Sequence, residues 1–148
     1  QVGIRSLSFE EAEFLKKSQK SKVKSQKCCI IHTYFAKDVI DGIPAKDICN
    51  NLTEDVFVTI DLDVFDPSIM PATGTPEPGG LGWYDVTRLL KSVAEKKNII
   101  GFDVVELCPI PGNVAPDFMT AKLVYKVMGY IVKAGIRYQV SGKTKPRT

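Results

Sequence analysis

Two apolar runs, each followed directly by a carboxylate, constrain the fold of this chain more than any other feature of its sequence. Residues 56–60 (VFVTI) and 99–105 (IIGFDVV) are rich in β-branched and aromatic side chains. Runs of this kind are typical of strands that are covered on both faces by other layers. We therefore expect two buried, parallel strands, with Asp61 and Glu106 at the same edge of the sheet.

Helical patterns separate these runs and define the fold class. Ser8 and Glu11 have the spacing of a capping box, which predicts a helix of about three turns after Ser8. Further helices are expected over residues 36–51, with an interruption near 42–44, over 83–97 and over 117–134. The alternation of strands and helices predicts an α/β domain with a parallel sheet and crossover helices.

Several less regular segments complete the chain. Residues 1–5 and 28–33 (CCIIHT) predict two additional strands, the second of them buried. The only histidine, His32, lies in the second segment, and we interpret it as a structural residue at the edge of the core. Residues 16–27 are basic and predict a solvated helix end and loop; an anion-binding patch is less favoured because no aromatic residues are interleaved. Residues 139–148 predict a polar tail.

The composition excludes several classes of protein. The 148 residues carry 20 Lys and Arg against 17 Asp and Glu, and the net charge of +3 is too small to indicate a dedicated nucleic-acid binder. No apolar run reaches the roughly 18 residues that a membrane-spanning helix needs. The four cysteines form no C-x-x-C pair, which favours reduced thiols. We therefore expect one domain in the cytoplasm, with no nucleic-acid or membrane partner.

Asp61 and Asp63 are the first candidates for a functional site. Side chains at positions i and i+2 of a strand point to the same face, so the two carboxylates should lie side by side where the first strand ends. Crowded carboxylates resist desolvation, and a hard cation such as Mn²⁺ or Mg²⁺ would relieve that conflict. The alternative is that both side chains cap the following loop by accepting backbone N–H bonds. The spacing alone leaves the two interpretations equally open.

The loop after these carboxylates favours a functional site. Residues 66–82 contain four prolines, which stiffen the segment, and four glycines, which permit close backbone approach. A long loop with this composition is not expected to be a passive connector.

At these residues the sequence resembles the ureohydrolase family, the arginases and agmatinases. The matching stretch reads DLDVFDPSIMPATGTPEPGGL from Asp61 onward. Three further pieces agree in order: QVGIRSLSFEE at the start resembles agmatinase-like members, GFDVVELCP from Gly101 resembles a later strand of the family, and TAKL from Thr120 resembles its last long helix. The resemblance covers roughly residues 1–135. It implies a three-layer arginase-like fold, a parallel sheet flanked by helices, with residues 1–138 as the C-terminal portion of a ureohydrolase domain.

The resemblance also assigns roles to individual residues. Asp61 matches a carboxylate that bridges two Mn²⁺ ions, and Asp63 matches a ligand of one of them. Glu106 matches the acid that pairs with the substrate guanidinium; the alternative is a surface or helix-capping carboxylate. The implied reaction is hydrolysis of a guanidino compound to an amine and urea. Agmatine is the favoured substrate because the G-I-R-S segment resembles agmatinase-like members. The alternative substrates are guanidinobutyrate, guanidinopropionate, formiminoglutamate and arginine.

Two further ligand motifs of the family, G-G-D-H and D-A-H-x-D, are missing from this sequence. Because the chain starts at Gln1 and its first methionine is Met70, we expect a C-terminal fragment that lacks ligands and is inactive alone, from a protein that is a homo-oligomer at full length. The rival interpretation is a non-catalytic relic, or a subunit that needs a separate N-terminal half. A Mg²⁺-dependent phosphotransfer protein is disfavoured because no Gly-rich phosphate loop opens a helix.

Overall fold

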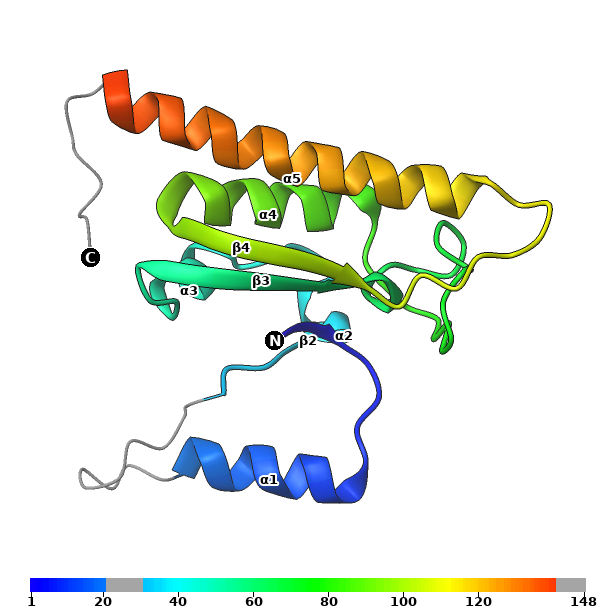
Figure 1. Ribbon diagram of the computed structural model, residues 1–148. Coiled ribbons are helices and arrows are strands. Elements are labelled where there is room, and N and C mark those ends of the chain that lie inside the picture. Colours follow the sequence, from blue (N-terminus) through cyan, green and yellow to red (C-terminus); the bar gives the residue numbers. More distant parts are fainter. Residues whose placement is uncertain (21–30, 141–148) are drawn as a thin grey trace.

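The computed structural model of the protein describes residues 1–20 and 31–140. Strands and helices alternate along the chain, and the predicted α/β class is confirmed (Figure 1). In chain order the elements are β1 (Val2–Ile4), α1 (Phe9–Lys20), β2 (Tyr34–Phe35), α2 (Ala36–Val39), α3 (Ala45–Asn50), β3 (Asp55–Asp61), the short 3-10 helix η1 (Leu62–Val64), α4 (Trp83–Lys96), β4 (Asn98–Val105) and α5 (Ala115–Val140).

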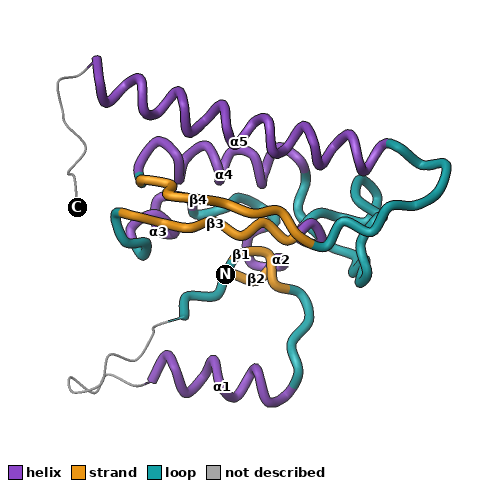
Figure 2. The backbone as a smooth tube through the Cα atoms, in the orientation of Figure 1, coloured by secondary structure: helices purple, strands orange, loops and turns teal. Residues whose placement is uncertain are grey.

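The strands β3 and β4 form a parallel pair, which confirms the predicted pairing of the two apolar runs. The register runs from Asp55 opposite Asn98 to Asp61 opposite Val105, with one irregularity after Val56. Helix α4 provides the crossover that a parallel connection requires. Helix α5 packs against α4 and also contacts β4 (Figure 2). Both strands therefore deliver their carboxyl ends to the same edge.

The larger hydrophobic core lies next to that edge. Its buried members come from α2, β3, η1, the following loop, α4 and α5: Val39, Ile60, Leu62, Phe65, Met70, Ala72, Leu81, Val86, Leu90, Leu123 and Val127. Phe65 and Leu81 also form a backbone bridge across the base of the Pro- and Gly-rich loop. The loop is thus anchored in the core at both ends and in its middle, which fits the expectation that it is not a passive connector.

The expectation that both strands are covered on both faces is wrong for the described residues. Phe57 of β3 is 59% exposed and Ile100 of β4 is 66% exposed. The physical reason is that α4 and α5 bury one face of the pair, on which Val56 and Ile60 lie, while Phe57 belongs to neither core cluster.

The strands β1 and β2 form a second parallel pair of only two residue pairs, Val2 with Tyr34 and Ile4 with Phe35. The strand predicted near the start of the chain is confirmed. The strand predicted over 28–33 is wrong where it can be judged: residues 31–33 are irregular, and 28–30 lie outside the described residues. Since β1 has just three residues, its ladder reaches only Tyr34 and Phe35.

The interpretation of His32 as a core-edge residue is also wrong, because its side chain is exposed. The residue precedes β2, and its structural contribution comes from the backbone. Its carbonyl oxygen accepts a hydrogen bond of 2.7 Å from the amino group of Gln1.

The helices are close to their predicted bounds. The capping box is confirmed: the Ser8 N–H donates to Glu11 Oε2 at 2.7 Å, and the Glu11 N–H donates to Ser8 Oγ at 3.2 Å. Helix α5 is longer than predicted and reaches two residues into the expected polar tail; 141–148 lie outside the described residues, as do 21–27 of the basic stretch. Among the described helices, none has the length and apolar character needed to cross a membrane.

Candidate functional site

The candidate site lies at the carboxyl ends of β3 and β4. Asp61 is the last residue of β3 and stands opposite Val105, the last residue of β4. Glu106 follows immediately, so Asp61 and Glu106 lie at the same sheet edge, as the sequence predicts. In open parallel sheets this is the edge at which ligands bind.

The strand argument for Asp61 and Asp63 is wrong in its geometry, although the two residues are neighbours. Asp63 lies in η1 and not in the strand, because the chain turns directly after Asp61. The Asp61 carboxylate accepts a hydrogen bond of 3.1 Å from the Asp63 N–H and thereby caps η1. The capping alternative is therefore correct for Oδ1 of Asp61.

The negative charges of the carboxylates at this edge repel one another. Partial burial raises the pKa of Asp61 above its usual value, and the negative charges of Asp63 and Glu106 raise it further. The hydrogen bond from the Asp63 N–H acts in the opposite direction and only partly offsets the rise. A bound cation would remove this conflict, since it favours the ionised form of all three groups.

The Pro- and Gly-rich loop orients Asp63. Thr75 donates a hydrogen bond of 3.2 Å from Oγ1 to Asp63 Oδ2. This contact joins a residue of the loop to a residue of η1 that lies 12 positions earlier in the chain. The sequence analysis missed the role of Thr75, because a threonine in a loop carries no signal of which carboxylate it will meet.

Asp66 organises the same loop from within, a role that was also missed. One of its oxygens accepts from the Gly79 and Gly80 N–H groups at 3.1 and 3.2 Å, and the other accepts from the Ser68 N–H at 3.0 Å. Hydrogen bonds with Ser68, followed by those with the two glycines, hold the pKa of Asp66 below its usual value. A side chain at Gly80 would collide with the backbone of Phe65 and Asp66. The sequence signal that could have indicated this role is the pair of turn-forming dipeptides, Asp66-Pro67 and Gly79-Gly80.

Glu106 has an unusual backbone. Its φ of 67° is the only positive value at a non-glycine position among residues 1–20 and 31–140. This conformation turns the chain away from β4 and presents an exposed carboxylate to the loop: a Cβ built on Gly74 would lie 3.8 Å from Glu106 Oε2. Next to it, the Cys108 N–H donates to the Ala72 carbonyl oxygen at 2.8 Å and fastens the two segments together.

The carboxylate oxygens at this edge are suitable ligands for a hard divalent ion, but the described residues supply only part of a complete ligand set. Asp61 and Asp63 offer carboxylate oxygens, the donors that Mn²⁺ and Mg²⁺ prefer. Within the described part of the chain, no group of three or more His, Cys, Asp or Glu side chains could hold a metal ion. Nearby in β4, Asp103 Oδ1 is buried and has no hydrogen-bond partner among the described residues. Since buried oxygens normally have a donor, Asp103 Oδ1 is an unsatisfied acceptor within the described residues.

Comparison with known proteins defines the class. Residues 1–132 match the model of the arginase family, so the chain belongs to that family. Over 131 residues it is 39% identical to the N(1)-aminopropylagmatine ureohydrolase of Synechocystis, which covers 87% of this chain and 39% of that enzyme. Over 83 residues it is 41% identical to the agmatinase of Pyrococcus horikoshii, covering 56% of this chain and 29% of that enzyme.

The structural comparison confirms the predicted arginase-like fold. The agmatine ureohydrolase of Thermoplasma volcanium superposes with a TM-score of 0.69 and 26% identity, over 93% of this chain and 43% of that structure. The chain therefore spans less than half the length of these relatives.

Proposed function

We propose that this chain supplies part of the active site of a ureohydrolase, which hydrolyses a guanidino compound to an amine and urea. The observation that carries the proposal is the convergence of Asp61, Asp63 and Glu106 at one sheet edge in a member of the arginase family. Agmatine is the first substrate to test, because relatives with similar sequence are named agmatinase and N(1)-aminopropylagmatine ureohydrolase.

The three carboxylates have different proposed roles. Asp61 and Asp63 are metal ligands, and the hydroxyl of Thr75 orients Asp63 by a hydrogen bond. Glu106 binds the planar guanidinium by accepting two parallel N–H bonds, the geometry that a carboxylate provides for such a cation. Two Mn²⁺ ions, when bound, lower the pKa of a water molecule so that it can attack at neutral pH. The fastened loop limits movement of these groups relative to one another.

The chain needs additional ligands to do this. Mn²⁺ takes about six ligands, and two carboxylates leave most positions to water. We therefore propose that the 148-residue chain alone binds Mn²⁺ weakly and releases no urea. The complete enzyme is proposed to be a cytoplasmic homo-oligomer.

A second candidate is a non-catalytic relic or a subunit that completes a site with a separate chain. The observation that favours it is the lack of any three-residue metal-ligand cluster within the described residues. Under this alternative, the carboxylates at the sheet edge would serve only as caps.

A chimaera tests the proposal against this alternative. Residues 1–132 replace the matching region of the Synechocystis enzyme, and urea release is measured with Mn²⁺ and agmatine, N(1)-aminopropylagmatine, guanidinobutyrate or arginine. The proposal expects turnover of at least one substrate, while the 148-residue chain alone gives none. A folded chimaera that binds Mn²⁺ but hydrolyses none of these compounds would favour the non-catalytic alternative.

A further inference from the structure

The outer face of helix α5 carries an apolar stripe. Figure 1 shows α5 along the outside of the molecule, and the helix packs against α4. Its inner face is used by the larger core, in which Leu123 and Val127 are buried. On the outer face, large apolar side chains are more than half exposed: Phe118, Tyr125, Met128, Val132 and Ile136. A continuous exposed apolar patch marks an interaction surface, whereas single exposed apolar residues do not.

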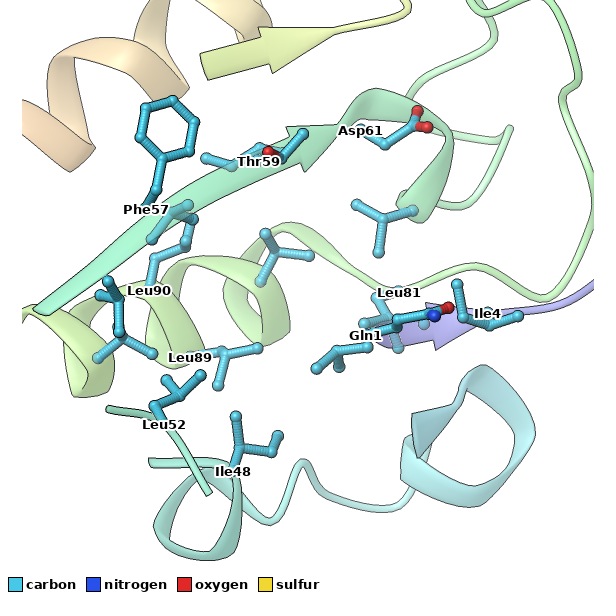
Figure 3. Close-up of a pocket in the computed structure, with 18 of the residues that line it drawn as sticks. Gln1, Ile4, Ile48, Leu52, Phe57, Thr59, Asp61, Leu81, Leu89 and Leu90 are labelled. Carbon is cyan, nitrogen blue, oxygen red and sulfur yellow. The ribbon is translucent and has the colours of Figure 1, made fainter. Parts of the chain in front are cut away.

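This stripe is distinct from the apolar pocket of about 480 Å³ between β1 and β3 (Figure 3). Among the described residues, those that line the pocket come from the start of the chain, α3, β3 and α4 and the segments next to them, and α5 contributes none. The stripe and the pocket can therefore be tested independently.

The stripe follows a seven-residue repeat. Its members are alternately three and four residues apart, as are the a and d positions of a coiled coil: Phe118, Ala121, Tyr125, Met128, Val132 and Gly135. A helix with this repeat keeps the same face toward a second helix that it packs against. The pattern thus indicates that the occupant of the stripe is a helix.

Two glycines on this face have no constraint from the described residues. A Cβ built on Gly129 or on Gly135 would meet nothing within 4 Å. After proline, glycine is the least favourable residue in the interior of a helix. Its use at two open positions of α5 is explained if another helix approaches closely there, because glycine leaves room for a facing side chain or backbone.

We propose that the stripe binds the same stripe of a second copy of the chain, with the two α5 helices antiparallel about a two-fold axis. Facing positions then combine a large with a small side chain toward each end and two long ones in the middle: Phe118 with Gly135, Val132 with Ala121, and Tyr125 with Met128. Gly129 lies beside its own counterpart near the axis. A two-fold contact of this kind is self-complementary, so one surface serves both copies.

Other pairings of the same stripe fit less well. Parallel helices would place Phe118 against Phe118 and Gly135 against Gly135, which crowds one end and leaves a cavity at the other. An antiparallel pairing shifted by one heptad leaves about half of the stripe unpaired. This match of sizes between the two halves of the stripe favours a second copy over an unrelated helix.

The area of the stripe is sufficient for a weak dimer. If each large side chain contributes about 100 Å², two copies bury roughly 1,000 Å² in total, close to the lower limit for a specific interface. We therefore expect a dissociation constant in the micromolar range. The proposal concerns this surface and does not rest on the proposed reaction.

Lysines along one flank of the stripe set its response to salt. They are Lys122, Lys126 and Lys133, and the Nζ atom of Lys122 lies 5.7 Å from the centroid of the Tyr125 ring. Antiparallel pairing places the lysine flanks of both copies on the same side of the contact, where they repel one another. Because salt screens this repulsion, the dimer should be tighter at high salt.

The first test is the mass of the 148-residue chain in solution. Sedimentation equilibrium from low micromolar to near-millimolar concentration should show one copy converting to two. Raising NaCl from about 0.1 to about 1 M shortens the screening length from about 10 to about 3 Å and should strengthen the dimer. A mass of one copy at every concentration, a mass of three copies, or a dimer weakened by salt would each overturn the proposal.

A matched pair of tyrosine variants locates the contact. Tyr125 on the stripe is 71% exposed and Tyr84 in α4 is 67% exposed, and each ring has a basic side chain over it. We expect Tyr125→Lys to weaken the dimer about tenfold or more, because the added charge must be desolvated at the contact. Tyr84→Lys should leave the dimer unchanged. Equal dissociation constants for the two variants would contradict the proposal, including the case in which the copies associate through their strand edges.

A second pair of variants tests the antiparallel alignment. Gly135→Leu should weaken the dimer about tenfold or more, since the new side chain takes the space of Phe118 from the second copy. The same change favours the helix in the single copy, so loss of folding is not expected. Adding Phe118→Ala should restore most of the affinity, because a large and a small side chain again face each other. A double variant that dimerises no better than Gly135→Leu would overturn the antiparallel pairing.

Discussion

The β3–β4 unit (residues 55–140) and the β1–β2 unit (residues 1–20 and 31–39) use the same parallel pairing but differ in what supports it. Seven residue pairs join β3 to β4, and α4, α5 and the anchored loop bury a large core against them. Two residue pairs join β1 to β2, and the nearby helix α1 leaves Phe9 75% and Phe14 61% exposed. The difference indicates that the carboxylates lie on the unit that supplies most of the larger core, whereas the β1–β2 unit contributes only Val39 to its buried members.

The largest effect should come from the site that the β3–β4 unit carries. In the chimaera, Asp61→Asn should reduce urea release by far more than the roughly 10–100-fold typical of losing an outer-shell partner of a metal. Under the proposed role of Asp61 as a metal ligand, the change would remove a negative charge that favours cation binding, so at least one Mn²⁺ should be lost. Metal content and turnover are measured together, with Asp38→Asn in the β1–β2 unit as the exposed control.

The contrast in packing can be measured directly in the chain. Leu62→Ala should lower the free energy of unfolding by about 2–5 kcal/mol, because Leu62 is fully buried in the larger core. Phe9→Ala in α1 should change it by less than about 0.5 kcal/mol, since that side chain is mainly exposed. Urea denaturation of both variants provides the comparison. Equal losses would show that the two units are supported alike.

Glu106→Gln separates substrate binding from metal binding at the same edge. The chimaera variant should keep both Mn²⁺ ions and lose about 1.5–3 kcal/mol of guanidinium binding, roughly 10- to 150-fold in kcat/KM. Metal analysis and steady-state kinetics test this. Loss of metal in Glu106→Gln with retention in Asp61→Asn would reverse the assigned roles.

The smallest effect concerns pH in the metal-free chain. The pKa of Asp61 is raised in the folded state, so its contribution to stability is complete below the pKa of the unfolded chain and is lost as pH rises through the folded pKa. Asp61→Asn should therefore become more stable relative to the unchanged chain as pH rises through that range, because Asn carries no charge and still offers an oxygen to the Asp63 N–H. Thermal unfolding with a chelator between about pH 3 and 7 measures the difference. Divergence in the opposite direction would contradict it.

Local sequence signals predicted much of the fold. The capping box at Ser8 and Glu11, the spacing of apolar residues in α4 and the two apolar runs each depend on neighbours within one element, so they could be recognised in the chain. The acidic residues at the ends of those runs then located the common sheet edge.

Long-range features could not be predicted in the same way. The exposed face of Phe57 depends on which element covers it, and no local pattern contains that information. The turn into η1 takes Asp63 out of the strand, and its hydrogen bond with Thr75 joins residues 12 positions apart. His32 lies in an apolar stretch, but its side chain is exposed, and the local pattern does not contain that information.

The left-handed backbone of Glu106 has a consequence for how such a chain changes over generations. A non-glycine residue in this conformation costs roughly 1–2 kcal/mol, and Gly or Asn at the same position avoids most of that penalty. If no selection retained a carboxylate at this position, substitution of Glu106 by Gly or Asn would stabilise the protein and could become established. Sequencing this position in populations that carry the gene would then distinguish a working ureohydrolase, which keeps Glu, from a relic, which drifts toward the relaxed residues.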